Sequence, residues 1–406
     1  MPAEIAAKQL IQEACDQADL VEPRLRALVA EPERRSRLLA EAEQQDPSVQ
    51  PFLIGVKDIV NVDSFPTKAG STLPAELFAG PEAPVVSQLR RAGALVLGKT
   101  ATTEFAFSEP APTTNPHDEH HTPGGSSSGS AAAVAAGYTS LAIGTQTVDS
   151  IVTPAAYCGT VGYKPSFGRV PIDGVLPFST AMDHVGFLAQ DVETAAFAAE
   201  IVCSGWRGTT KAERPAIGLP APSYLDLTDT AALAEFDRTV AALSSAGYRV
   251  MQTDSLADIK VIGLRHRALI AAQFAEVHRE WFAKHGDRYR PRSAALIAEG
   301  SALGPEVVEE GLKGSAHLRA ELERTMDDLS IDVWMSPAAT GPAPRGLDAI
   351  GDPIMALPWT HAHMPVVCLP TGTAASGLPL GIQLIGRLGA DEELLEFARS
   401  TARLLA

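Results

Sequence analysis

The stretch that decides the fold is TPGGSSSGSAAAVAAG, residues 122–137, in which glycine and serine lead directly into small apolar residues. Glycine permits close backbone approach, and an alanine-rich continuation is typical of a tightly packed helix. A helix that begins here presents free N–H groups, which suit an anion or an oxyanion. A flexible linker is the alternative, but linkers do not lead at once into an apolar packing surface.

Strand-like and helix-like segments alternate on both sides of this stretch, up to about residue 190. Residues 50–62 and 93–100 are apolar runs bounded by turns, and the stretch after residue 137 continues into another apolar run. This alternation is typical of a sheet whose faces are covered. We therefore predict an α/β fold: a single large domain with a central mixed, mostly parallel sheet covered by helices on both faces.

The two ends of the chain and one internal segment have other patterns. Residues 1–50 are charged and helix-periodic, which predicts an N-terminal helical segment. Residues 51–406 then form the main α/β domain, with a helical insertion around residues 225–330, where amphipathic patterns dominate. Residues 364–386 are expected to give two apolar strands before a terminal helix.

Composition excludes several classes of function. The net charge of −16 argues against non-specific nucleic-acid binding and against an anionic membrane surface. Four cysteines lie far apart without a CxxC pair, which favours reduced thiols in a cytoplasmic protein over disulfides or a zinc site. No secretion signal is evident at the N-terminus. The uncharged residues 120–148 could span a membrane by length, but their glycines and hydroxyls favour a loop and a buried helix.

Three short motifs match known functional patterns, but each lacks the surrounding structure or the spacing that its function requires. Residues 125–129 match G-x-S-x-G around Ser127, but no strand precedes them, as a nucleophile elbow requires. Residues 93–100 match a P-loop formally, but the intervening residues are apolar and indicate a buried strand. The histidines of residues 117–121 lack metal-ligand spacing. We therefore interpret them as solvated histidines of a surface loop and not as a metal site.

Lys57 follows the apolar run FLIGV, which would carry it into the interior. Burial disfavours the charged form of a lysine, and a neutral amine can act as a general base. Two alternatives are open from spacing alone: the side chain reaches the surface, or it pairs with Asp58.

Three motifs in fixed order now form a recognisable pattern: GVKDIV at residues 55–60, the Gly/Ser stretch, and GTQTVDSIVTPAAYCG at residues 144–159. Together they resemble the motifs of the amidase signature family. Their sequences are most similar to those of its malonamidase-like bacterial members. Ser126 and Ser150 stand 24 positions apart, which is the family's interval between its catalytic serines. The resemblance extends over most of the chain, from about residue 50 to 400.

The resemblance implies a Ser-Ser-Lys relay that needs no metal and no organic cofactor. Lys57 matches the catalytic lysine, Ser126 the bridging serine beside a cis peptide, and Ser150 the nucleophile that forms an acyl-enzyme. The backbone N–H groups of four successive residues would form the oxyanion hole: Thr147, Val148, Asp149 and Ser150. Ser127 and Thr103 are candidates for supporting hydrogen bonds, and Thr153 and Trp359 for substrate binding. The expected partner is a small-molecule amide, and a homodimer is left open.

The chain departs from the family pattern beside the nucleophile. Val148 and Asp149 replace two glycines, so a β-branched side chain and a carboxylate lie where bare backbone is usual. The arginine that holds a substrate carboxylate in malonamidase-like enzymes is also absent, because residues 152 and 153 are valine and threonine. We therefore expect a less charged or larger acyl group than malonamate, unless Arg345 or Arg387 supplies the charge.

Three functions remain open at this stage. The first is an amidohydrolase that acts on a small carboxamide. The second is an amide or acyl transferase, or a transamidase-type subunit. The third is a catalytically weakened member, because of Val148 and Asp149. We expect the pocket to be lined by residues from 100–120, 265–300 and 356–365.

Overall fold

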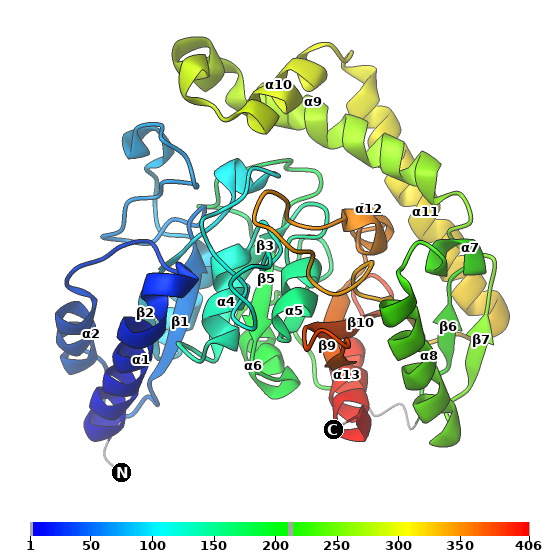
Figure 1. Ribbon diagram of the computed structural model, residues 1–406, viewed down its shortest axis with the longest axis horizontal. Helices are drawn as coiled ribbons and strands as arrows, with labels where there is room; N and C mark the ends of the chain where they lie inside the picture. Colours follow the sequence, from blue (N-terminus) through cyan, green and yellow to red (C-terminus); the bar gives the residue numbers. More distant parts are fainter. Residues whose placement is uncertain (1–2, 210–213, 406) are drawn as a thin grey trace.

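The computed structural model describes residues 3–209 and 214–405. Within these residues ten strands form one sheet, in the order β2-β1-β3-β5-β4-β9-β10-β8-β6-β7 (Figure 1). The strands are β1 (Phe52–Lys57), β2 (Ala94–Thr100), β3 (Leu141–Gln146), β4 (Val161–Lys164), β5 (His184–Ala189), β6 (Ile217–Leu219), β7 (Val250–Gln252), β8 (Val333–Pro337), β9 (Val366–Thr373) and β10 (Pro379–Ile385). The predicted single α/β domain with a mixed sheet is confirmed.

The strand directions correct one part of this prediction, because the sheet is not mostly parallel. β1 runs parallel to β2 and β3, and β6 runs parallel to β7 and β8. Every ladder from β3 through β5, β4, β9 and β10 to β8 is antiparallel. Parallel neighbours need a long crossover, and residues 374–378 between β9 and β10 are too few to form one.

Helices cover both faces of the sheet (Figure 1). They are α1 (Ala3–Leu25), α2 (Arg34–Glu43), α3 (Pro84–Arg91), α4 (Ser128–Ala135), α5 (Val152–Cys158), α6 (Val192–Val202), α7 (Pro222–Leu225), α8 (Thr230–Ser245), α9 (Ile259–His285), α10 (Pro291–Ser301), α11 (Glu306–Leu329), α12 (Leu357–His361) and α13 (Asp391–Leu405). Leu53, Leu95 and Leu97 share a core with α1, α2 and α4. Ile54 and Val96 alternate with them and point to the opposite face, where α3 contacts β2.

The long helix α9 packs on α10, α11 and α12, and we call α9, α10 and α11 the cap helices. In Figure 1 they arch over one end of the molecule, above α12. Backbone N–H groups at the start of α10 bind two carboxylates of the loop after β2: Arg290 N donates to Glu104 Oε2 at 3.1 Å, and Arg292 N donates to Glu109. The cap helices are therefore tied to the sheet side of the molecule.

The predicted helical insertion over residues 225–330 contains α8 and the cap helices, but also the edge strand β7, which pairs with β6. At the other end of the chain, α1 and α2 pack directly on β1 and β2. The division into residues 1–50 and 51–406 stays a prediction. The uncharged stretch before residue 149 forms the buried helix α4 and strand β3, as expected. None of the helices in the described part of the chain combines the length and apolar character needed to cross a bilayer.

Candidate active site

The carboxyl ends of three adjacent parallel strands bring the predicted catalytic residues together. β2, β1 and β3 are neighbours with the same direction, so their carboxyl ends meet at one edge of the sheet. Lys57 is the last residue of β1, and β3 ends just before the loop of residues 147–150. Ser126 lies just ahead of α4, which packs on α5 after that loop. Residues far apart in the sequence therefore converge on one place.

Lys57 is fully buried and contacts Ser126 directly. Its Nζ lies 2.7 Å from Ser126 Oγ and 2.8 Å from Thr145 Oγ1. The peptide bond between Gly125 and Ser126 is cis. Neither alternative for Lys57 is found, because the side chain does not reach the surface and Asp58 is paired with Lys99 at 2.9 Å. Thr145 was missed at the sequence level, since a threonine inside an apolar strand gives no signal of its own.

The pKa of Lys57 is lowered to about 7, mainly because burial removes the ammonium group from water. The carboxylates of Asp183 and Asp149 oppose this effect by stabilising the charged form. Asp183 is itself held in place, since Thr147 Oγ1 donates to its Oδ1 at 2.6 Å. A neutral amine is therefore accessible near neutral pH, as a general base requires.

Ser150 lies at the wall of a cavity of about 280 Å³. Its carbonyl accepts a hydrogen bond from Ser127 N at 3.3 Å, which joins its loop to the segment that carries Ser126. Within residues 3–209 and 214–405, no hydrogen bond involves the Ser150 hydroxyl, and this side chain lines the cavity. A nucleophile at this position can therefore meet a substrate.

The loop of residues 147–150 has the free donors that an oxyanion hole needs. The N–H groups of Thr147, Val148 and Ser150 donate to no acceptor among the described residues. Val148 and Asp149 are not among the residues with positive φ, so the backbone conformation here is one that a residue with a side chain adopts. The replacement of glycine is therefore compatible with this loop geometry.

Asp149 is buried, and burial raises its pKa to about 7, while the Thr153 hydroxyl lowers it. Its Oδ2 has no hydrogen-bond partner among the described residues. Near neutral pH a large share of this side chain is therefore the neutral acid. The conflict expected between a carboxylate and a developing oxyanion is smaller than the sequence indicates.

Four further residues were predicted near the site. Ser127 Oγ donates to Thr145 O at 3.2 Å, and Thr103 N donates to Ser126 O at 3.4 Å. Thr153 N donates to Asp149 O at 2.9 Å. Trp359 is fully buried against Tyr224 and Trp334, and it lies outside the lining of the Ser150 cavity. The structure thus brings three of the four to the relay or its loop.

The cavity wall is mostly apolar. All three predicted segments contribute to it, which confirms that prediction. Beyond the loop of residues 147–150, the lining consists of Ala106, Phe107, Ser108, Phe178, His266, Arg267, Ile270, Ile350, Gly351, Pro353 and Leu357. Phe178, Ile350, Gly351 and Pro353 were missed because they lie in irregular segments or at the start of a short 3-10 helix, where no periodicity indicates an inward-facing side chain.

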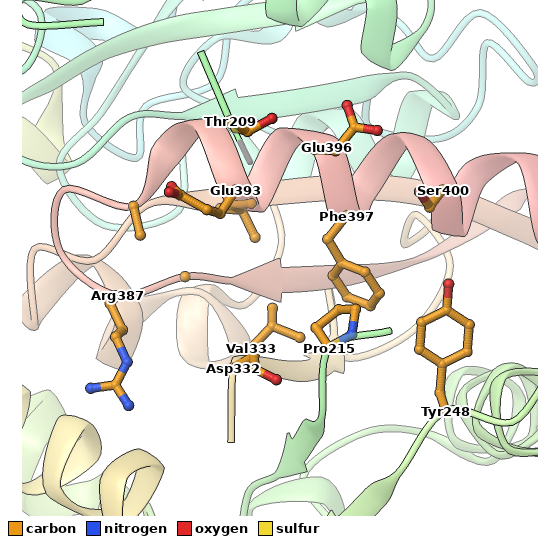
Figure 2. Close-up of a pocket in the computed structure, with 13 residues that line it drawn as sticks. Thr209, Pro215, Tyr248, Asp332, Val333, Arg387, Glu393, Glu396, Phe397 and Ser400 are labelled. Carbon is orange, nitrogen blue, oxygen red and sulfur yellow. The ribbon is translucent and has the colours of Figure 1, made fainter. Parts of the chain in front are cut away.

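The positive charge at the cavity comes from a residue that was not predicted. Arg345 is exposed and is not part of the lining. Arg387 lines a different cavity, of about 510 Å³, beside α13 (Figure 2), and it pairs with Asp327 at 2.8 Å. Arg267 of α9 does line the Ser150 cavity, but it pairs with Glu299 at 2.7 Å.

In the described ranges, His, Cys, Asp and Glu side chains form no group of three or more that could hold a metal ion. The four cysteines are all buried and free. Burial raises the pKa of Cys158 and of Cys368, so these two thiols are held in the protonated form.

Two glutamyl-tRNA(Gln) amidotransferase A subunits are similar to this chain. The one from Symbiobacterium thermophilum is 30% identical over 456 residues, which covers 98% of this chain and 93% of that protein. The one from Natronomonas pharaonis is 31% identical over 389 residues, which covers 82% of this chain and 90% of that protein. The chain therefore spans nearly the whole length of these relatives.

Solved structures and a family model agree with this similarity. A crystal structure of an amidase has a TM-score of 0.89 at 27% identity, covering 99% of this chain and 96% of that one. The native peptide amidase from Stenotrophomonas maltophilia has the same fold, with a TM-score of 0.83 at 23% identity, covering 100% of this chain and 94% of that one. The family model described as Amidase matches residues 9–395. The chain belongs to the amidase family, and it is an enzyme that acts on amides.

Proposed function

We propose that this protein is an amidohydrolase that cleaves a small-molecule carboxamide through a Ser-Ser-Lys relay and an acyl-enzyme. The observation that carries the proposal is the 2.7 Å contact of the buried Lys57 amine with Ser126, next to the loop that holds Ser150. A lysine with a pKa of about 7 and a serine beside it form a base that can accept the proton of a second serine.

The reaction then runs in two stages. Ser150 Oγ attacks the amide carbon, while its proton passes to Ser126 and the proton of Ser126 passes to Lys57. The tetrahedral oxyanion faces the N–H groups of the 147–150 loop, where one good donor is worth roughly 3–4 kcal/mol. The C–N bond breaks, the amine leaves with the returned proton, and an acyl ester on Ser150 remains. Water adds to this ester by the same route and releases the acid.

The cavity supports an uncharged, largely apolar acyl group as the substrate. Phe107, Phe178, Ile270 and Leu357 contribute to its wall, and its volume of about 280 Å³ fits a small molecule. The charge of Arg267 is balanced by Glu299, so no free cation faces the substrate from this residue. These features favour a neutral amide over a malonamate-type acid.

A second candidate is a transamidase-type subunit, because the relatives at 30–31% identity are amidotransferase subunits. The same acyl-enzyme, formed from glutamine, would release ammonia for a partner subunit. The apolar cavity favours hydrolysis of a less polar amide. The identity of the preferred amide therefore distinguishes the two candidates.

The test is ammonia release from a panel of primary amides that includes aliphatic amides, malonamate and glutamine, with Ser150→Ala as the control. We expect turnover of aliphatic amides that the control lacks. A strong preference for glutamine would favour the second candidate instead. No turnover by the wild type, with a gain in the Val148→Gly/Asp149→Gly double variant, would identify a weakened member and contradict the proposal.

A further inference from the structure

Two side chains from distant helices hold the carbonyl groups of the 147–150 loop. His266 Nε2, on α9, lies 3.1 Å from Thr147 O. Thr360 Oγ1, on α12, donates to Val148 O at 2.6 Å. Both helices approach the loop from outside the strand-loop-helix unit that carries Ser150, so the loop is fixed to another part of the fold.

Backbone groups hold the next two carbonyls. Thr153 N donates to Asp149 O, and Ser127 N donates to Ser150 O, at 2.9 Å and 3.3 Å. These donors belong to α5 and to the segment that precedes α4. The two hydrogen bonds therefore form whenever those helices form. The His266 and Thr360 contacts are different, because each depends on one side chain.

A carbonyl that is held from one side also fixes the N–H group of the same peptide. In a trans peptide the C=O and the following N–H point in opposite directions. Gly125–Ser126 is the cis peptide of the described chain, so the loop peptides are trans. The bond to Thr147 O therefore orients Val148 N–H, and the bond to Val148 O orients Asp149 N–H. Both N–H groups belong to the predicted oxyanion hole. Val148 N–H donates to no acceptor among the described residues, whereas the Asp149 carboxylate accepts from its own backbone N–H.

The protonation state of His266 follows from its partners. A carbonyl oxygen only accepts, so His266 carries its proton on Nε2. Its Nδ1 lies 3.1 Å from Nδ1 of His361, which must then be the donor of that pair. Burial lowers the pKa of His266 to about 4, so the ring stays neutral at neutral pH. His361 thus fixes the tautomer that His266 needs in order to bind the loop.

Thr360 is also held in one orientation. Its Oγ1 accepts a hydrogen bond from Gln146 Nε2 at 2.8 Å. Its proton has two acceptors within reach, Val148 O at 2.6 Å and Ala356 O at 3.2 Å, and the shorter contact is the one to Val148 O. The other end of the same amide, Gln146 Oε1, accepts Ile151 N and Val152 N at 2.8 and 3.0 Å. One glutamine therefore connects Thr360 to the start of α5, directly after the nucleophile.

We propose that His266 and Thr360 are positioning residues, which fix the two peptides that follow Thr147 and Val148 and so direct the free N–H groups of the loop toward the oxyanion that forms at Ser150. The proposal rests on the proposed acyl-enzyme chemistry. Neither side chain transfers a proton or bonds to the substrate in this role. Each acts through a peptide of the loop that carries Val148 and Asp149.

The Thr360 hydroxyl can be removed with little change in volume. Thr360→Val loses the donor to Val148 O, whereas Thr360→Ser keeps it. We expect Thr360→Val to slow fluorophosphonate labelling of Ser150, and to lower kcat on an amide, by ~10- to 100-fold, somewhat less than the loss of a whole oxyanion donor. KM should change by less than about threefold, because ground-state binding does not use the oxyanion contact. Thr360→Ser should restore most of the rate.

His266 provides an independent pair of variants. His266→Leu removes the donor to Thr147 O, and His266→Gln keeps an amide N–H at a similar reach. The matched control is His278→Leu, because His278 is a buried histidine of the same helix whose Nδ1 contacts Tyr289 and not the loop. We expect a slower rate for His266→Leu, partial recovery for His266→Gln, and a wild-type rate for His278→Leu. Thermal melts identify any variant that fails to fold.

The outcomes separate this inference from the proposed function. If the wild type is not labelled at Ser150, the proposed function fails and the inference fails with it. If the wild type is labelled, but folded Thr360→Val and His266→Leu are labelled at the wild-type rate, the inference is overturned while the proposed function stands. A rise in KM without a fall in kcat would also overturn it, because that result indicates substrate binding.

Discussion

The two halves of the candidate site are built in different ways. On the sheet side, Lys57, Ser126 and Ser150 come from strand ends and the segment before α4, all within the first 150 residues. On the cap side, the cavity wall comes from α9 and from residues 350–357, far along the chain. The sheet side contains the reactive groups, while the cap side is mostly apolar surface.

In this fold, the residues that carry out the chemistry and the residues that select the substrate can therefore vary separately. The sheet side is constrained by a ladder of parallel strands and by a buried lysine that needs specific partners. The apolar lining of the cap side is constrained by helix packing, which accepts many side chains of similar volume. His266 is a separate case, because it contacts the loop of residues 147–150. Changes on the sheet side should therefore lower kcat for every substrate, and changes in the apolar lining of the cap side should alter the ranking of substrates.

The largest effect is expected at Lys57. Lys57→Met removes the base but keeps an apolar chain of similar length, so kcat should fall by about 10³-fold while the protein still folds. The measurement is ammonia release, together with a thermal melt. The matched control is Lys164→Met, because Lys164 is also fully buried with a pKa lowered to about 7, but donates to Met364 O. Equal losses in both variants would mean that burial, and not base catalysis, explains the effect.

The next largest effect is expected on the cap side. Ile270 lines the cavity and is 3% exposed, so Ile270→Ala should open space for a longer acyl group. We expect kcat/KM for short acyl amides to fall by ~10- to 100-fold, with a smaller loss or a gain for longer ones. The neighbouring Leu269 is fully buried outside the lining, and Leu269→Ala controls for lost packing. An equal loss for all acyl chain lengths would contradict the distinction between the sheet side and the cap side.

The pH dependence of activity tests the role of Lys57 on the sheet side. Lys57 must be neutral to act, and its pKa is about 7. At pH 6, kcat/KM should therefore be about tenfold below its plateau at higher pH. The Asp149 carboxylate raises the pKa of Lys57. Asp149 is itself partly neutral near pH 7, so Asp149→Asn should move the acid limb of the profile only slightly, and to lower pH. A limb that moves to higher pH would contradict the charge coupling between these two groups.

The smallest effect concerns the ion pair at the cavity edge. Arg267 and Glu299 are each 42% exposed in their side chains, so this pair is weak and salt-dependent. Glu299→Gln frees the Arg267 charge and should raise kcat/KM for a carboxylate-bearing amide by at most about fivefold at low salt. High salt should remove the gain, and neutral amides should not respond. A similar gain for neutral amides would rule out the charge as its cause.

The sequence predicts the sheet side of the site better than the cap side. The Gly/Ser stretch and the apolar run before Lys57 are local signals, and both correspond to the elements they predict. The direction of the strands was not predictable in the same way, because β5 enters between β3 and β4 and β9 pairs with β10 through a short turn. Strand order and strand direction depend on tertiary contacts, which local sequence patterns do not indicate.

The cap side depends on contacts between residues that are far apart. His266 reaches Thr147 across 119 positions, and Gln146 reaches Thr360 across 214. Trp359 was predicted to bind substrate, yet its ring packs in the core, and Leu357 lines the cavity instead. Helical periodicity shows that such segments pack, but it does not show which turn of the helix meets the site.

The most direct test of the central claim is to label the folded protein with a fluorophosphonate and map the modified peptide by mass spectrometry. A Ser-Ser-Lys relay predicts one adduct, on Ser150, which forms in the wild type and in Lys164→Met and is lost in Lys57→Met. An adduct on another residue, or labelling of Ser150 that does not depend on Lys57, would contradict the relay.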